Sequence, residues 1–107
     1  MLDASLFVSD MIHERKIKLA DDTEHVLWFK ELPQIQFSKY QAAARSESEE
    51  VRASSVAKLI SLSLCEPNGA LMVTEEKAAQ LKPVVSNAII GAIMEINGFG
   101  GREEKKD

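Results

Sequence analysis

Two histidine–glutamate neighbours carry the side chains of this sequence that could do acid–base chemistry. His13 precedes Glu14, and His25 follows Glu24. An imidazole beside a carboxylate serves as a general acid or base when folding adds a nucleophile and a third orienting group. No such groups and no glycine-rich cradle accompany these pairs in the sequence, so we interpret them as exposed polar residues near a hairpin. We therefore predict that the protein is not an enzyme.

The sequence also lacks the ligand spacing of a metal or cofactor site. Its single cysteine, Cys65, and its two histidines lie at unrelated spacings, which fits neither a structural zinc set nor a His-x-x-x-His pair. The glycines near the C-terminus lie in or after an expected helix, whereas a phosphate loop connects a strand to a helix. We expect no metal and no cofactor, and we interpret Cys65, at the end of an apolar helical run, as a small buried hydrophobe.

Composition and charge restrict the partners. The chain has 107 residues, 45% of them hydrophobic and 28% charged, which is typical of one globular domain. Its 13 basic and 17 acidic residues give a net charge of −4, so duplex nucleic acid would meet net repulsion. The longest uncharged run, residues 83–94, is too short to span a bilayer, and no basic region precedes the N-terminal apolar residues. With one cysteine no internal disulfide can form, and we expect a cytoplasmic protein that binds neither nucleic acid nor membrane.

A β-hairpin is the first element that the sequence predicts. Charged and apolar residues alternate over residues 15–20, and apolar residues return over 25–31 after the polar stretch 21–24. That stretch lacks glycine, so we expect a connection longer than a two-residue turn. Residues 1–14 fit a short helix or a strand, and we favour a short strand or turn. The hairpin must pack on the helices that follow, and its buried face is expected to contain Ile17 and Leu19 with either Val26 and Trp28 or Leu27 and Phe29.

Helices are predicted from Pro33 onward. The spacing of Phe37, Tyr40 and Ala44 indicates a first helix, and Ser48 before two glutamates predicts that a second helix begins near residue 48. One long helix over residues 36–64 is the alternative. The apolar stripe of the second helix is Ala53, Val56, Ala57, Ile60 and Leu64.

Strong turn and cap signals divide the C-terminal part of the chain. Residues 66–69, Glu-Pro-Asn-Gly, form a break, and residues 71–73 follow as a short extended piece. Thr74 before two glutamates predicts a helix of about two turns that ends near Leu81. Pro83 suits the first turn of a last helix, which is expected to stop at Asn97 and Gly98.

Together these signals predict an α+β fold that is mainly α-helical, with an N-terminal β-hairpin followed by three to four packed helices. We assign residues 1–100 to a single domain. Residues 101–107 are expected to form a flexible charged tail.

The last helix and the second hairpin strand supply the candidate partner contacts. Apolar residues cover so much of the helix that it must be either deeply buried or shared with another chain. Gly91 costs about 1 kcal/mol relative to alanine in mid-helix, which indicates close approach of another backbone or a modest defect. The adjacent aromatics of the strand point to opposite faces, so one is free for a partner unless residues 1–14 cover it. The candidate partner-binding residues are Trp28, Phe29, Ile90, Ile93 and Met94.

Two blocks of the sequence carry a resemblance to a known family. The first is Lys-Leu-Ala-Asp-Asp-Thr-Glu at 18–24, leading into Val-Leu-Trp-Phe-Lys-Glu-Leu at 26–32. The second is Thr-Glu-Glu-Lys-Ala-Ala-Gln-Leu at 74–81, followed by the apolar positions and the Glu-Ile-Asn-Gly end of the last helix. In element order and length the chain resembles the tail assembly chaperones of long, non-contractile-tailed double-stranded DNA bacteriophages, over most of residues 15–100.

The resemblance implies a function without a catalytic motif. Such a protein binds the long tape measure protein, keeps it soluble, helps to recruit tail tube subunits and is absent from the finished virion. The family commonly makes a longer form by ribosomal frameshifting, whose added domain contacts the tail tube protein, and the charged end at 102–107 is a candidate junction. On this basis we expect helix-in-groove recognition by many copies, self-association as a homo-oligomer, and a location in the bacterial host cytoplasm.

Other functions remain as alternatives at this stage. A small structural neck or tail-completion protein of the virion would share the size and the α+β character. A small hydrolase that uses His13 or His25 is a third reading. A DNA-binding regulator is the fourth, and the acidic net charge disfavours it.

Overall fold

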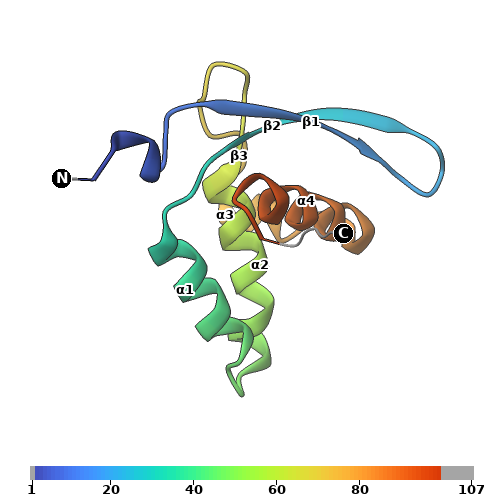
Figure 1. Ribbon diagram of the computed structural model, residues 1–107. Helices are drawn as coiled ribbons and strands as arrows, with labels where there is room; N and C mark the ends of the chain where they lie inside the picture. The colour runs from blue at the N-terminus through green and yellow to red at the C-terminus, as the bar shows by residue number, and fades with distance from the viewer. Residues whose placement is uncertain (1, 100–107) are drawn as a thin grey trace, which may run out of the picture.

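A three-stranded antiparallel sheet lies over a layer of helices in the computed structural model, which describes residues 2–99 (Figure 1). The fold is α+β and mainly α-helical, as the sequence predicted. The expected charged tail, residues 101–107, lies outside the described residues. In chain order the elements are the 3-10 helix η1 (Ala4–Leu6), β1 (Ile12–Lys18), β2 (Glu24–Lys30), α1 (Gln34–Ala44), α2 (Glu49–Ser63), β3 (Leu64–Cys65), α3 (Glu75–Ala78) and α4 (Pro83–Ile96).

The hairpin of β1 and β2 begins earlier than the sequence indicated. Its register runs from Ile12 opposite Lys30 to Lys18 opposite Glu24. The expected longer turn is confirmed: Leu19 N–H donates to Thr23 C=O at 2.9 Å, and Asp22 N–H donates to Leu19 C=O at 2.9 Å. Asp22 has a φ of 69°, so an aspartate takes the left-handed position that glycine usually fills.

The register decides which face of the hairpin is buried. Ile17 and Phe29 point toward the helices and are 7% and 0% exposed, with Leu27 half-buried between them, so the second of the two predicted faces is the correct one. Val26 is 40% exposed on the opposite face. Trp28 is half-buried there, beside Cys65 of β3. The loop that follows β3 therefore covers part of this outer face, whereas residues 2–11 do not.

The helical hairpin consists of two helices and not one. Ser48 accepts a hydrogen bond from Val51 N–H and begins α2, as its capping signal predicted. Ser55 and Leu59 of α2 face α1, while Ala57 faces α3. Leu64 was expected to end the helical stripe, but it lies in β3 opposite Phe29. The helix stops there because pairing with β2 satisfies the extended backbone of residues 64–65.

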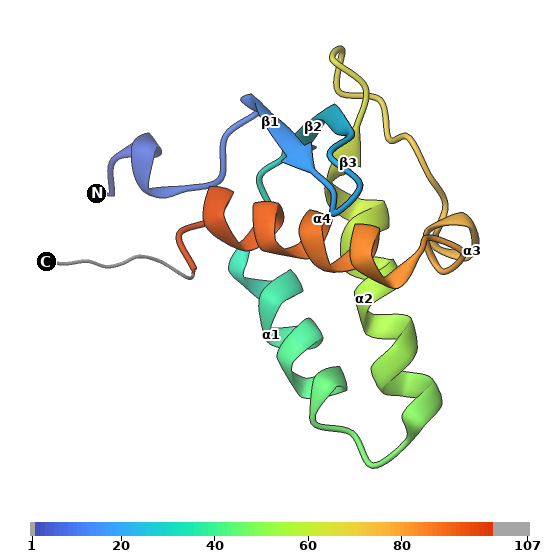
Figure 2. The same cartoon turned by 90° about the vertical axis from the view of Figure 1, so that its right-hand side faces the viewer.

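The C-terminal helices follow their cap residues. Thr74 accepts a hydrogen bond from Lys77 N–H, yet α3 is a single turn of 4 residues and so is shorter than expected. Pro83 occupies the first turn of α4, and Gly98 ends it with a φ of 86°. Figure 2 shows α4 lying across α1 and α2, beneath the strands. The core between these layers consists of Ile17, Phe29, Phe37, Ala57, Leu59, Ile60, Leu64, Ala78, Ile89 and Ile93.

Candidate partner-binding surface

The structure places two of the predicted partner residues in the core. Phe29 and Ile93 are both 0% exposed, so neither reaches a partner in this fold. Trp28, Ile90 and Met94 are half-buried and keep part of their surface. The prediction was wrong for Phe29 and Ile93 because the period-two and helical patterns identify apolar faces but do not show which other elements cover those faces.

The broad apolar surface of α4 is used mainly inside the molecule. The helix packs against α2 on one side and β1 on another, and Ile89 and Ile93 are buried between them. Val84, at 50% exposure, is the large apolar side chain of α4 that remains exposed. A β-carbon added at Gly91 would meet nothing within 4 Å, so the close backbone approach that this glycine suggested does not occur within residues 2–99.

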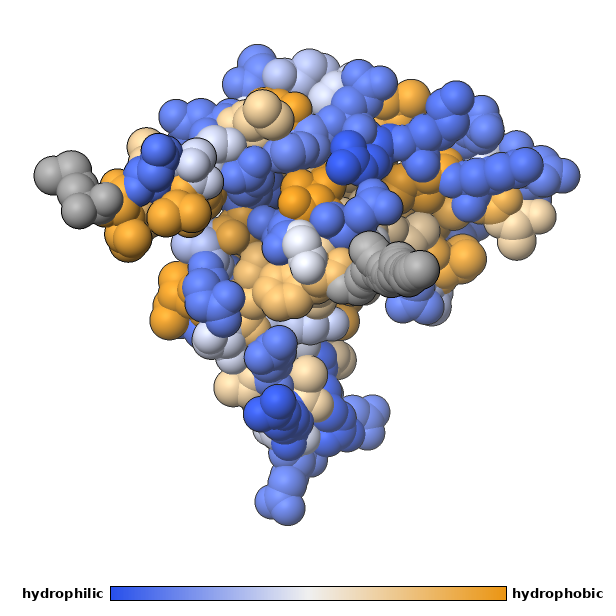
Figure 3. Space-filling view, in the orientation of Figure 1, coloured by the Kyte–Doolittle hydropathy of each residue, from blue (hydrophilic) through white to orange (hydrophobic). Residues whose placement is uncertain are grey.

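The exposed apolar surface gathers instead at the N-terminus. Among residues 2–99, five of the eleven exposed large hydrophobic side chains lie in the segment before β1. We call them the N-terminal apolar face, and Figure 3 shows hydrophobic residues gathered at this end of the molecule. They are Leu2 (66% exposed), Leu6 (67%), Phe7 (58%), Val8 (48%) and Met11 (61%). Exposed large apolar side chains that gather in one part of a molecule are candidates for an interaction surface.

A cleft of about 520 Å³ lies beside the N-terminal apolar face. Leu6, Phe7 and Val8 form one wall. The other walls come from the connection between β2 and α1 and from the end of α4, including Leu32, Pro33, Gln34, Ile96 and Asn97. The next residue of α1, Ile35, is itself 56% exposed. Chain segments far apart in sequence thus combine apolar side chains around one hollow that is open to solvent.

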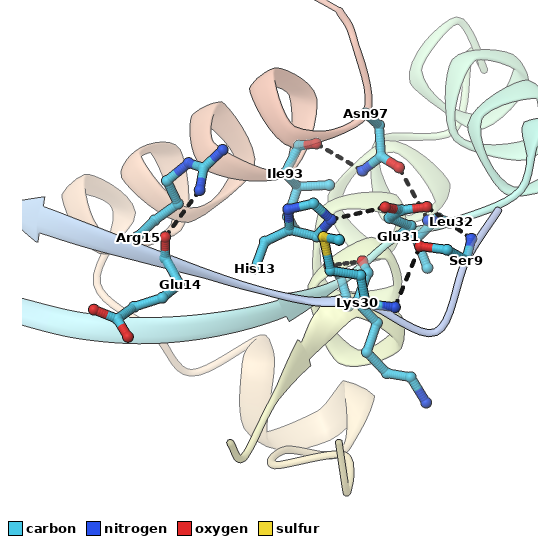
Figure 4. A network of polar contacts seen from close by, with 11 residues as sticks. Ser9, His13, Glu14, Arg15, Lys30, Glu31, Leu32, Ile93 and Asn97 are labelled. Atoms are coloured by element: carbon cyan, nitrogen blue, oxygen red, sulfur yellow. Dashed lines mark hydrogen bonds and ion pairs between the residues drawn. The ribbon is translucent and has the colours of Figure 1, made fainter. Parts of the chain in front are cut away.

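A network of polar contacts anchors the N-terminal segment to the body (Figure 4). Glu31 is its centre: one carboxylate oxygen accepts Ser9 N–H at 2.8 Å, and the other lies 2.8 Å from Nε2 of His13. The Ser9 N–H and the His13 ring hold the pKa of Glu31 below its usual value, against a smaller opposing effect of burial. Glu31 therefore ties the segment, β1 and the end of β2 together through its charged form.

Asn97 makes the matching connection at the other wall of the cleft. Its side-chain oxygen accepts Leu32 N–H at 3.0 Å, and its side-chain nitrogen donates to Ile93 C=O at 2.8 Å. The residue was expected only as a helix stop, and it also fixes the end of α4 to the start of the β2–α1 connection. Side-chain hydrogen bonds therefore connect two walls of the cleft to the body, through Glu31 and through Asn97.

The two histidine–glutamate neighbours of the sequence are not joined into one site. His13 contacts Glu31 and not its neighbour Glu14, because adjacent strand residues point to opposite faces. His25 lies opposite Ile17, four positions along β1 from His13, which separates the two rings by about 13 Å of strand. His13 is 18% exposed in its side chain, so it is a partly buried structural group and not the exposed residue that we expected.

Cys65 is confirmed as a buried residue, although it lies on β3 and not at a helix end. It is 0% exposed, and burial raises the pKa of its thiol. No three His, Cys, Asp or Glu side chains come together as a potential metal site within the part of the chain that the structure describes. The helices found between residues 2 and 99 are all too short or too polar to cross a membrane.

Sequence reasoning missed the N-terminal apolar face. Its residues have no helical or alternating period, which left residues 1–14 without an assigned face. The signal that could have found it is the run Leu6, Phe7 and Val8, which has no polar alternation and no partner stripe. Comparisons with known protein families, with curated proteins and with solved structures found no match to this chain.

Proposed function

We propose that the chain is a tail assembly chaperone of a long-tailed bacteriophage, which binds the tape measure protein in the host cytoplasm and is absent from the finished virion. In this proposal an apolar helical stripe of the tape measure protein lies on the N-terminal apolar face and the adjoining cleft. The observation that carries it is the concentration of five exposed large apolar side chains before β1. The sequence resemblance supplies the identity of the partner.

The face has the chemistry that helix-in-groove recognition needs. Such recognition inserts apolar side chains at helical spacing into a hydrophobic groove. Full burial of one large apolar side chain contributes about 1.5–3 kcal/mol, so a few of these side chains suffice for weak binding by one copy after the costs of association. Many copies along a long partner would then add their effects, and each would shield a stretch of that partner from aggregation.

Recruitment of tail tube subunits belongs to a longer form of the protein in this proposal. A frameshift-extended product would present the tail tube protein to a tape measure protein that the chaperone domain already covers. The short chain would act mainly as the solubilising partner.

Co-expression with a tape measure fragment tests the proposal. We expect the soluble share of the fragment to rise when the chain is present, and to fall again with Leu6→Ser and Phe7→Ser combined. The matched control is Val84→Ser, which removes an exposed apolar side chain outside the face and should leave solubilisation unchanged. A fragment that is no more soluble with the chain than without it would exclude the chaperone role.

Mass spectrometry of purified particles supplies the second readout. A chaperone should be missing from them, because it leaves before the tail is complete. Detection of the chain in stoichiometric amount would instead support a structural neck or tail-completion subunit.

A further inference from the structure

The outer edge of β1 is a second surface, separate from the N-terminal apolar face. The strand order is β1-β2-β3, so one side of β1 has no paired strand within residues 2–99. Because Leu19 bonds to Thr23 and the ladder alternates from there, the backbone groups of four β1 residues point away from β2. These residues are Ile12, Glu14, Lys16 and Lys18. An open row of this kind is a template for another strand.

We propose that this edge binds the same edge of a second copy of the chain, so that two sheets join into one. The strands would run antiparallel, with the two-fold axis at Arg15. All 7 residues of β1 are paired in this register, and the outward backbone groups of each copy face those of the other. Glu14 then lies opposite Lys16 of the partner subunit, and symmetry repeats the pair.

Charge and the number of paired residues together favour this register. A slip of two residues in one direction places Glu14 opposite its own copy and forms no pair of opposite charges. A slip in the other direction pairs Glu14 with Lys18 of the partner subunit but places Lys16 opposite its own copy. Either slip leaves five residues of β1 paired instead of 7. Like charges directly opposite are destabilising, whereas opposite charges stabilise a cross-strand pair. In the favoured register the Arg15 side chains face each other on the inner side, where each has a carboxylate 3.0 Å away, Glu95 Oε1 of its own α4.

One contact must rearrange when the edges meet. Arg15 Nη1 donates to the Glu14 carbonyl at 2.9 Å, which covers one acceptor of the open edge. The ion pair of Arg15 with Glu95 uses a different guanidinium nitrogen, so the side chain can keep that contact while it releases the carbonyl to the partner strand.

Helix α4 lies beneath the same edge. A groove of about 280 Å³ separates it from β1 and is lined on the helix side by Ala88, Gly91, Ala92 and Glu95. A two-fold axis perpendicular to the joined sheet puts both copies of α4 on one side of the sheet, where they run antiparallel. Figure 2 shows β1 and α4 on the same side of the molecule. The open space at Gly91 fits a close helix approach across this axis.

A charge-swap series on the full chain tests the proposal by sedimentation equilibrium. We expect the unaltered chain to dimerise reversibly. Lys16→Glu and Glu14→Lys should each raise the dimer dissociation constant about tenfold or more, because each creates two like-charge pairs. Combining the two substitutions restores opposite charges and should return the constant to within about threefold of the unaltered chain.

Lys18→Glu is the matched control. It makes the same charge change on the same face of the same strand, but residue 18 would lie opposite Ile12 of the partner subunit, so dimerisation should change little. Thermal unfolding of each variant checks that the monomer is folded, which matters because Lys16 is also 3.8 Å from Glu24 in its own chain. Three results would each overturn the proposal. The unaltered chain could stay monomeric, the dissociation constant could stay the same in both single variants, or the double variant could fail to regain the dissociation constant of the unaltered chain.

Hydrogen exchange gives an independent readout of the same edge. The amides of Glu14, Lys16 and Lys18 should exchange more slowly as the concentration of the unaltered chain rises, and this dependence should vanish in Lys16→Glu. Protection at residues 6–11 instead would place the dimer contact on the N-terminal apolar face and contradict the proposal. None of these substitutions touches that face, so the chaperone role stands or fails separately.

Discussion

Phe29 and Phe7 are the same side chain in opposite surroundings. Phe29 lies between the sheet and the helices with 0% of its surface exposed, whereas Phe7 is 58% exposed beside an open cleft. The first has cross-strand, helix and core neighbours, and the second has a wall of the cleft on one side only. The contrast shows that one set of apolar residues stabilises the fold, whereas another set stays exposed and can contact a partner. Substitutions in the two regions should therefore separate stability from partner binding.

The largest effect should come from the buried member of this comparison. Phe29→Ala leaves a cavity in the core and should lower the free energy of unfolding by about 3–5 kcal/mol. Denaturant unfolding followed by circular dichroism measures the loss. A change below about 1 kcal/mol would mean that Phe29 is not the centre of the core.

The Glu31 network, which connects the N-terminal segment to β1, should have a smaller and pH-dependent effect on the free energy of unfolding. Glu31→Gln weakens the bonds to Ser9 and His13 and should cost about 1 kcal/mol at neutral pH, since the carboxylate is partly exposed. The pKa of Glu31 is lowered in the folded state, so its stabilisation is complete above the unfolded pKa near 4.5 and disappears as the pH falls through the folded value.

Unfolding curves of Glu31→Gln and the unaltered chain over a pH series check this. Their difference should be constant at neutral pH and should shrink below about pH 4.5. A difference that grows on acidification would contradict the assigned role of the charged carboxylate.

Substitution of Gly91 tests whether another part of the same copy approaches α4 closely at this position. Because a new β-carbon meets nothing within 4 Å, Gly91→Ala should stabilise the monomer by about 0.5–1 kcal/mol through helix propensity. Thermal unfolding at low concentration, where any dimer is dissociated, measures this gain. Destabilisation under those conditions would show a hidden close contact in the monomer.

The exposed member of the comparison should have the smallest effect on stability. Phe7→Ala is expected to change the free energy of unfolding by less than about 0.5 kcal/mol, because its side chain is mostly in water. The same denaturant experiment as for Phe29→Ala provides the comparison. A loss as large as that of Phe29→Ala would show that the N-terminal segment belongs to the core.

Local signals in the sequence were sufficient for the starts of α2 and α3 and for the end of α4. Ser48 and Thr74 bond to backbone N–H groups at helix starts, and Gly98 adopts the left-handed backbone of a helix stop. These features depend on neighbouring residues only, so a single sequence carries them. The same holds for the turn at Asp22, which needed no long-range contact.

Features that depend on contacts between residues far apart in the sequence could not be predicted. Val26, Leu27, Trp28 and Phe29 are all apolar, so the strand itself gives no preference for one face, and the choice follows from the register with β1 and the helices beneath. The two-residue strand β3 continues a helical pattern and exists only because β2 pairs with it. The cleft is built from the N-terminal segment, the β2–α1 connection and the end of α4, which no local pattern brings together.

The most direct test of the N-terminal apolar face as the partner-binding surface follows backbone amide NMR signals of the full chain. The chain is titrated with a soluble peptide that carries one apolar stripe of the tape measure protein. We expect the largest shifts at Leu6, Phe7, Val8 and Met11, with smaller shifts at Leu32 and Ile96 across the cleft, and little response in Phe7→Ser. Unchanged signals in these residues at saturating peptide, or shifts confined to α1 and α2, would contradict the assignment of the N-terminal apolar face as the partner-binding surface.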